Sequence, residues 1–219
     1  MESNFKGFDK NAIDFLFALR FSNTIENQAQ NIANYKKYIT EPLNLLYLDL
    51  ISVTGQFDIC LETKPARCIS SPYTDRRFSP TVPLKEYMYL RFRQANKSND
   101  MLGLYFDMGC EAYGFGLRIY KASSKGMNEL KDKISANPRL FSRLIDELKS
   151  KGFEIEGESY KKDHFPEIEQ CSAKELLNMK SFSVSQTKLI NENIFSIALK
   201  QELTEAFYDL KEFAERLAE

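Results

Sequence analysis

A stretch at residues 68–86, CISSPYTDRRFSPTVPLKE, gathers side chains that could do chemistry. It holds three prolines, Pro72, Pro80 and Pro83. Because each proline removes a backbone donor and restricts the residue before it, the stretch favours a shaped loop over a regular helix or strand. Asp75 stands two residues before Arg77, a spacing that puts both side chains on the same side of an extended segment. A carboxylate beside a guanidinium stays ionised, so we expect an anchoring ion pair rather than a general acid.

Nucleophiles in this loop would need a base nearby. The loop contains the hydroxyl groups of Ser70, Ser71 and Ser79, but His164, the one histidine, is remote in the sequence and lies in a charged segment. We therefore interpret His164 as an exposed loop residue rather than half of a catalytic pair. Basic neighbours could lower the pKa of Cys68, although the pattern favours a buried thiol at a strand end.

Metal and cofactor motifs are missing from the sequence. One histidine and scattered cysteines give no zinc-ligand spacing, and no clustered acidic motif resembles a two-metal site. The glycines at 109, 114 and 116 do not form the GxGxxG turn that opens a dinucleotide-binding helix. We expect neither a metal nor a cofactor.

The loop leads into the clearest strand pattern of the chain. Runs at 87–93, 101–107 and 112–120 alternate apolar and polar residues, and the links 94–100 and 108–111 separate them. This pattern predicts an antiparallel meander. One face of the meander is apolar, with Met88, Leu90, Phe92, Leu102, Leu104, Phe106, Phe115, Leu117 and Ile119.

The opposite face of the meander mixes rings, charges and glycines. It carries Tyr87, Tyr89, Arg91, Arg93, Gly103, Tyr105, Asp107, Gly114, Gly116, Arg118 and Tyr120. Because the glycines clear space beside large side chains, either a segment of the chain or a ligand could lie against this face. Paired arginines on an ordinary solvated surface are the competing interpretation.

The rest of the chain predicts helices around this sheet. Amphipathic patterns predict helices at 9–20, 126–134, 138–151 and 173–179, and a long C-terminal helix at about 192–218. A further amphipathic pattern runs from about 26 to 50 and is interrupted by Pro42, which we expect to open a second helix at its first turn, from Pro42 to Val53. Further strands are expected at 57–62, 66–70, 153–160 and 181–187, the last at a sheet edge. With no internal repeat or linker, we expect one α+β domain spanning residues 1–219.

Composition limits the partners. A net charge of -1 argues against general attraction to nucleic acid or an anionic membrane, although residues 64–93 hold seven basic and two acidic residues and leave a nucleic-acid ligand open. Acidic residues near the start oppose a signal peptide, and no apolar run approaches the roughly 18 residues of a membrane span. The four cysteines form no CxxC pair, so we expect free thiols and a cytoplasmic protein.

The loop also carries a family resemblance. Thr74-Asp75-Arg76-Arg77-Phe78-Ser79, followed by Pro83-Leu84-Lys85, resembles the signature of a bacterial family known as domain of unknown function 2461, which has an Arg-Asp-x-Arg-Phe-Ser core, an Asp-Lys or Asn-Lys pair and then Pro-Tyr-Lys. The similarity extends to Phe15-Leu16, Asn23, Tyr35, Pro42-Leu43, residues 113–117 and the segment after Met127. It implies a compact bacterial domain and implies no reaction.

This chain departs from the signature at three places. Thr74 replaces an arginine, Leu84 replaces the tyrosine, and Pro80-Thr81-Val82 replaces the Asp-Lys neighbourhood with one residue fewer. If that pair is catalytic in the relatives, this chain has lost or altered the activity.

Three functions compete. The leading hypothesis is a binding module for a small anionic or nucleotide-like ligand, with a site formed by Asp75, Arg77, Lys85, Tyr87, Tyr89, Arg91, Tyr105 and Arg118. The first alternative is a hydrolase-type enzyme that acts on a phosphate or acyl substrate through Asp75 or a loop serine. The second is an oligomeric scaffold or interaction protein, for which the C-terminal helix should leave an apolar stripe exposed. The sequence leaves the oligomeric state open.

Overall fold

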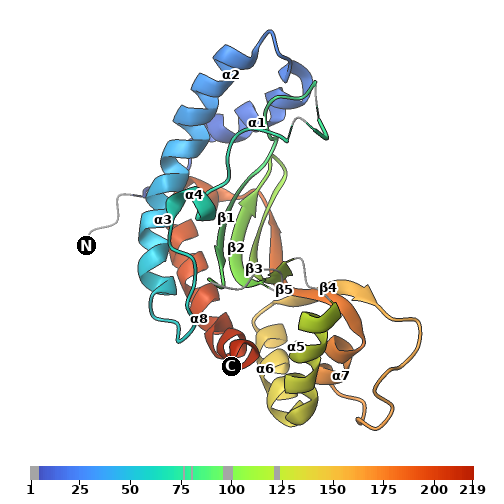
Figure 1. The fold of residues 1–219 in the computed structure, drawn as a ribbon. Coiled ribbons are helices and arrows are strands. Elements are labelled where there is room, and N and C mark those ends of the chain that lie inside the picture. Colours follow the sequence, from blue (N-terminus) through green and yellow to red (C-terminus); the bar gives the residue numbers. More distant parts are fainter. Residues whose placement is uncertain (1–4, 76, 80, 96–100, 121–123) are drawn as a thin grey trace.

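The computed structural model describes residues 5–75, 77–79, 81–95, 101–120 and 124–219, so Arg76 and Pro80 of the 68–86 loop and residues 96–100 of the predicted link lie outside the described residues. Within these ranges, five strands form one antiparallel sheet in the order β1-β2-β3-β5-β4 (Figure 1). The strands are β1 (Met88–Arg93), β2 (Met101–Met108), β3 (Ala112–Tyr120), β4 (Glu154–Ser159) and β5 (Met179–Leu189). The predicted meander and the predicted α+β class are both confirmed.

Helices surround this sheet. They are α1 (Lys10–Ser22), α2 (Gln28–Tyr35), α3 (Glu41–Thr54), α4 (Pro65–Cys68), α5 (Ser124–Ala136), α6 (Pro138–Ser150), α7 (Ser172–Leu177) and α8 (Ala198–Ala218), with a π-helical turn η1 (Lys36–Thr40) and a 3-10 turn η2 (Glu192–Phe195). Figure 1 shows α1 and α2 at one end of the molecule and α5, α6 and α7 at the other, beside β4. No described helix is both long and apolar enough to cross a membrane.

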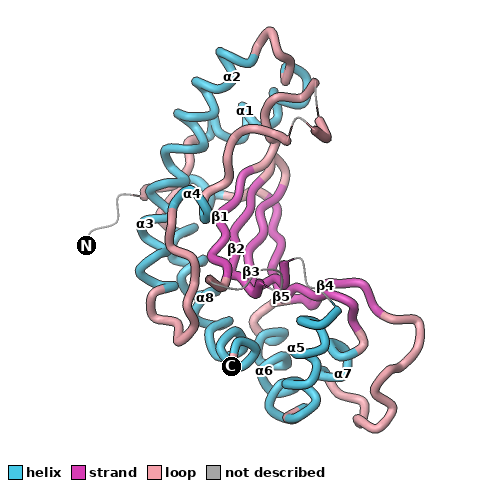
Figure 2. Tube along the Cα trace, in the orientation of Figure 1, coloured by secondary structure: helices cyan, strands magenta, loops and turns pink. Residues whose placement is uncertain are grey.

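The apolar face of the meander forms the core, as the alternation predicts. All nine side chains predicted for it are buried. Helices α3 and α8 lie together on this side of the strands (Figure 2), where α3 contacts β1 and α8 contacts β2 and β3. The Phe92 ring stacks on Tyr47 of α3 at 6.1 Å between ring centroids and meets the Phe207 ring of α8 edge-on at 6.1 Å. Because the core lies here, the other face of the meander points away from α8.

The predicted second helix with Pro42 in its first turn is confirmed, and a change of helix type rather than a gap precedes it. Helix α3 begins at Glu41, with Pro42 in its first turn, where a missing N–H costs little. The preceding π-helical turn follows α2 directly, and the Glu41 N–H donates to the Lys36 carbonyl five residues back. The wider turn therefore lets the chain stay helical up to the proline.

Two predicted strands are wrong. Residues 66–70 are mostly helix α4, because Pro65 opens a helical turn and the Cys68 N–H donates to the Lys64 carbonyl at 3.1 Å. Residues 57–62 follow the end of α3 in turns and make one isolated bridge, from Leu61 to Gln94. Both segments run beside β1, and Ile69 forms a second isolated bridge there.

The position of β5 in the sheet and the start of the C-terminal helix also differ from the predictions. Strand β5 was predicted at an edge, but it pairs with β3 on one side and with β4 on the other. Its serines fit an internal position because Gly116 of β3 approaches closely, and a Cβ there would lie 2.8 Å from the Ser185 Cβ. The C-terminal helix begins at Ala198 rather than near 192, because Ser196 is extended (φ -143°, ψ 175°) and separates it from η2.

Candidate functional site

The face of the sheet that points away from α8 carries rings and charges in three cross-strand rows. The rows across β1, β2 and β3 are Tyr89-Asp107-Gly114, Arg91-Tyr105-Gly116 and Arg93-Gly103-Arg118. Strand β5 continues them with Thr187, Ser185 and Ser183. We call these twelve residues the polar sheet face. Its glycines stand next to tyrosines, arginines and an aspartate, as the sequence pattern predicts.

One end of the polar sheet face is a ladder of rings and cations. The Tyr87 and Tyr89 rings stack at 6.3 Å between centroids, and Tyr87 is 49% exposed. The Arg91 guanidinium lies 3.6 Å above the centroid of the Tyr89 ring, and the Lys85 Nζ lies 5.3 Å from it. Lys85 is held there by the Ser71 carbonyl, which accepts from Nζ at 2.7 Å. Four predicted site residues therefore form one continuous surface that joins the loop to β1.

Tyr105 and Arg118 lie at the centre of the polar sheet face. The Arg118 guanidinium lies 4.9 Å from the centroid of the Tyr105 ring, and Tyr105 is only 4% exposed. Burial raises the pKa of Tyr105, although a hydrogen bond with Ser185 and the charge of Arg118 act against that rise. The Ser185 hydroxyl in turn lies 3.5 Å from a carboxylate oxygen of Glu156 on β4. Tyr105 is thus a support beneath Arg118 rather than an open contact surface.

Asp107 was not among the predicted site residues, yet it lies on the polar sheet face between Tyr89 and Gly114, where the charges of Arg118 and Arg91 act on it. Burial raises the pKa of its carboxyl, whereas the charges of Arg118 and Arg91 and a hydrogen bond from the Gly114 N–H lower it. A Cβ on Gly114 would lie 3.2 Å from an Asp107 oxygen, so the glycine makes room for the carboxylate. The strand alternation had placed Asp107 on this face, but nothing in the sequence indicated its burial.

Asp75 and Arg77 form the predicted ion pair within the loop. The Arg77 Nη2 lies 2.5 Å from one Asp75 oxygen and the Arg77 Nε lies 2.9 Å from the other. The Arg77 hydrogen bonds lower the pKa of the Asp75 carboxyl, which suits an anchor. Arg77 is mostly exposed and its other contact is the neighbouring Phe78 ring at 5.7 Å. Its charge is therefore engaged inside the loop rather than turned to the polar sheet face.

The loop borders an open cavity of about 420 Å³ that adjoins the ring ladder. It is lined by Thr74, Asp75, Phe78, Ser79, Val82, Leu84, Lys85, Glu86 and Tyr87. Lys85 and Tyr87 belong both to this cavity and to the ladder, so the loop and the sheet share a border. Of the eight predicted site residues, only Arg77 lies outside both the cavity and the polar sheet face with its ladder.

The nucleophile candidates of the loop have structural partners. The Ser70 hydroxyl accepts from the Tyr89 N–H at 3.1 Å and the Ser70 N–H donates to the Tyr89 carbonyl at 3.0 Å. The Cys68 thiol is buried and donates to the Glu62 carbonyl, and burial raises its pKa to about 11. The His164 ring lies 4.4 Å from the Tyr160 ring, tilted by 39° against it, in a separate loop. Ser70 and Cys68 therefore each have a structural partner within the fold.

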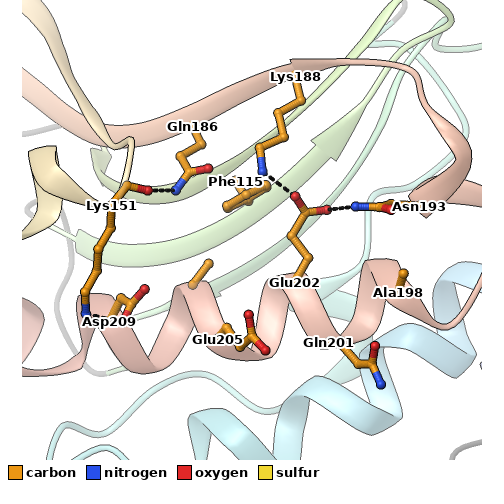
Figure 3. Close-up of a pocket in the computed structure, with 11 residues that line it drawn as sticks. Phe115, Lys151, Gln186, Lys188, Asn193, Ala198, Gln201, Glu202, Glu205 and Asp209 are labelled. Carbon is orange, nitrogen blue, oxygen red and sulfur yellow. Dashed lines mark hydrogen bonds and ion pairs between the residues drawn. The ribbon is translucent and has the colours of Figure 1, made fainter.

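A second cavity, which the sequence did not indicate, lies on the opposite side of the sheet, between β5 and α8 (Figure 3). It measures about 410 Å³. Two ion pairs cross it, Lys151 with Asp209 at 2.6 Å and Lys188 with Glu202. Glu202 also accepts from the Asn193 amide at 3.3 Å. Most of its charges are paired with one another, and they fasten α8 to the sheet.

A search for metal-ligand groups gives nothing in the described ranges. No three His, Cys, Asp or Glu side chains lie close enough together there to hold a metal ion. The polar sheet face presents guanidinium groups, phenol rings and the half-buried Asp107 carboxyl. Guanidinium groups bind oxyanions and tyrosine rings stack on planar rings.

A comparison with protein families finds one match that covers most of the chain. The model of the family described as "Conserved hypothetical protein (DUF2461)" matches residues 11–215 of the 219. A search of curated proteins finds no match. The matched range includes the 68–86 loop, the whole sheet and nearly all of α8.

Proposed function

The chain belongs to the DUF2461 family of conserved hypothetical proteins, and from the geometry of its polar sheet face we propose that it binds a small ligand carrying an anionic group and a planar ring. The ligand class is nucleotide-like. The anionic group would meet Arg91 of β1 and Arg118 of β3 near the middle of the polar sheet face, and the ring would lie toward the ring ladder at the loop border.

The observation that carries this proposal is the state of Arg118. Its guanidinium lies over the buried Tyr105 ring and forms no ion pair with any carboxylate of the described residues. Arg77 in the loop and Arg20 and Arg143 on helices contrast with it, because each pairs with a carboxylate at 3.0 Å or less. A positioned guanidinium with unused donors is suited to a bidentate oxyanion.

The ring ladder supports the second half of the proposal. Tyr87 is about half exposed and stacks on Tyr89, so the ladder presents aromatic rings to a ligand on this side of the sheet. Stacking of a base on an aromatic side chain contributes about 1–3 kcal/mol. The neighbouring Lys85 ammonium and Arg91 guanidinium add positive charge beside that ring.

Calorimetric titration with AMP, adenosine and inorganic phosphate tests the proposal. Wild-type protein should bind AMP more tightly than either fragment, because the anionic and ring contacts are made together. Arg118→Gln should weaken AMP binding by about ten-fold or more, the usual cost of losing a charge-assisted hydrogen-bond donor. Arg139→Gln, which removes an exposed arginine on α6, is the matched control and should bind like the wild type. Equal effects of the two variants would contradict the proposal.

The two alternatives have less support. The hydrolase-type enzyme would use Asp75 or a loop serine, but Asp75 is paired with Arg77 and Ser70 is bonded to the Tyr89 backbone. The scaffold would need an exposed apolar stripe on the C-terminal helix, whereas Leu199, Leu203 and the other apolar residues of that stripe are buried. A cytoplasmic location is part of our proposal, and the four free thiols are compatible with a reducing compartment.

A further inference from the structure

Asp107 is the one carboxyl group among the twelve residues of the polar sheet face. In the register of the sheet it lies opposite Tyr89 of β1 on one side and Gly114 of β3 on the other. A Cβ on Gly114 would lie 3.2 Å from an Asp107 oxygen and 3.6 Å from the Thr187 hydroxyl oxygen, so the carboxyl lies above the glycine. Asp107 is only half-buried, so a ligand on this face can reach it.

Two guanidinium groups lie on the residues that adjoin Asp107. The Arg91 guanidinium lies 3.6 Å from the centroid of the Tyr89 ring, and Tyr89 is the cross-strand neighbour of Asp107. The Arg118 guanidinium lies 4.9 Å from the centroid of the Tyr105 ring, and Tyr105 comes two residues before Asp107 on the same face of β2. Both positive charges lower the pKa of Asp107 and oppose the rise that burial causes. The two arginines that we assign to the ligand are therefore the cations that favour an ionised Asp107.

These two roles of the arginines conflict. An anion bound to Arg91 and Arg118 neutralises the charges that act on Asp107 and adds a negative charge beside it. Two negative charges close together in a half-buried site repel each other, so one of them is favoured to take up a proton. A protonated Asp107 removes the repulsion, and its O–H can donate a hydrogen bond to an oxygen of the anion.

We propose that the polar sheet face takes up a proton on Asp107 together with the anionic group of its ligand, so that Asp107 determines the pH range in which the ligand binds tightly. The inference rests on the proposed function, because it concerns the same ligand and the same two arginines. The linkage is reciprocal, so protons raise the affinity for the ligand by the factor by which the ligand raises the affinity for protons. Affinity should therefore fall as pH rises from the pKa of Asp107 in the free protein to its higher pKa in the complex.

The groups that face Asp107 leave it as the one expected to change charge near neutral pH. The charged and titratable groups are Tyr89 and Arg91 of β1, Tyr105 of β2 and Arg118 of β3. Phenol and guanidinium groups ordinarily titrate at about pH 10 or above. On the side of β5 the neighbour is the Thr187 hydroxyl, which does not titrate.

Asp107→Asn separates the proton from the shape of the side chain. The amide resembles a protonated carboxyl and has no proton to gain. Asp132→Asn is the matched control, because it makes the same change at an exposed residue of α5. Thermal melting monitored by circular dichroism identifies a variant that fails to fold.

Calorimetric titration with AMP from pH 5 to pH 8, in buffers of different ionisation enthalpy, gives both the affinity and the protons taken up. The AMP phosphate itself titrates at about pH 6 with every protein, so each variant is compared with the wild type. Asp107→Asn should take up fewer protons per AMP than the wild type. It should also bind AMP about ten-fold more tightly at pH 8, the effect of about one pKa unit on Asp107, and the two affinities should converge toward pH 5. Asp132→Asn should match the wild type throughout.

The outcomes separate this inference from the proposed function. If Asp107→Asn matches the wild type in affinity and proton uptake, or binds AMP more weakly at pH 8, the proton linkage is wrong and the proposed function stands. If the wild type does not bind AMP at any pH, both are wrong. If Asp107→Asn fails to fold, the carboxyl carbon resonance of Asp107 in isotope-labelled wild type decides. Its titration midpoint should move to higher pH when AMP is bound, and an unmoved midpoint would overturn the inference.

Discussion

The side-chain amide of Asn23 makes both hydrogen bonds that the Leu84 backbone offers. Its Oδ1 accepts from the Leu84 N–H at 3.1 Å, and its Nδ2 donates to the Leu84 carbonyl at 2.8 Å. Both residues are buried, and Asn23 is the first residue after α1. One side chain therefore takes the place of a neighbouring strand and fixes the end of the 68–86 loop, directly before Lys85 of the ring ladder.

This contact predicts a large stability effect at a residue with no other obvious role. Asn23→Ala leaves a buried N–H and a buried carbonyl without partners, so the free energy of unfolding should fall by about 2–4 kcal/mol. Asn23→Asp retains the acceptor and loses the donor, and it should also destabilise the protein. Urea unfolding measures both variants. A loss below about 0.5 kcal/mol for Asn23→Ala would show that water replaces the amide.

Asp107 predicts a pH dependence of stability. Its folded-state pKa is raised, so the native protein holds this proton more tightly than the unfolded chain. The stability contributed by the protonated carboxyl is present at low pH and is lost as pH rises from the ordinary value of 3.8 through the raised pKa. Asp107→Asn does not titrate, so its stability relative to the wild type should improve between pH 3 and pH 7.

Asp75→Asn is a control for that pH series, because the stability contributed by Asp75 should change with pH in the opposite direction. Arg77 lowers the pKa of Asp75, so the contribution of Asp75 is present above its ordinary pKa and is lost as pH falls through the lowered one. The free energy of unfolding of Asp75→Asn should therefore fall relative to that of the wild type as pH rises, and the difference should be small because the ion pair is exposed. Unfolding curves with the same pH trend for both variants would refute the assignment of Asp107 as a buried carboxyl.

Thiol reactivity should separate Cys60 from Cys68. Cys60 is exposed, whereas Cys68 is buried with a pKa of about 11, so roughly one Cys68 thiol in a thousand is ionised at pH 8. Alkylation at pH 8 followed by peptide mass spectrometry should label Cys60 well before Cys68, and urea should abolish the difference. Early labelling of Cys68 in the folded protein would show that its thiol is accessible and reactive.

The sequence predicted the meander because its strands alternate strictly, and the alternation also separated the core face from the polar face correctly. The strand predicted at residues 66–70 is wrong, because the apolar character of a short segment does not distinguish a strand from a single helical turn, which Pro65 starts here. Strand β5 was expected at an edge because of its serines, whose fit beside Gly116 depends on a close approach of two strands that only the fold shows.

The site was only partly accessible from sequence for a related reason. Spacing along a strand identifies the face on which Arg93 and Asp107 lie, but burial and unmade hydrogen bonds depend on neighbours from other strands. Arg93 lies in one cross-strand row with Gly103 and Arg118, and this arrangement is not visible in the sequence because the three residues are distant from one another there. The ion pair of Arg77 could be predicted from the sequence, because its partner Asp75 is only two residues away.

The most direct test of the account is to locate the ligand on the tyrosines. Isotope-labelled tyrosine gives each ring a nuclear magnetic resonance signal, which single Tyr→Phe variants assign. Addition of AMP should shift the signals of Tyr87 and Tyr89 on the ladder and leave those of Tyr208 on α8 and Tyr47 on α3 in place. If AMP at millimolar concentration moves neither Tyr87 nor Tyr89, the polar sheet face is not a nucleotide-like site and the central claim is contradicted.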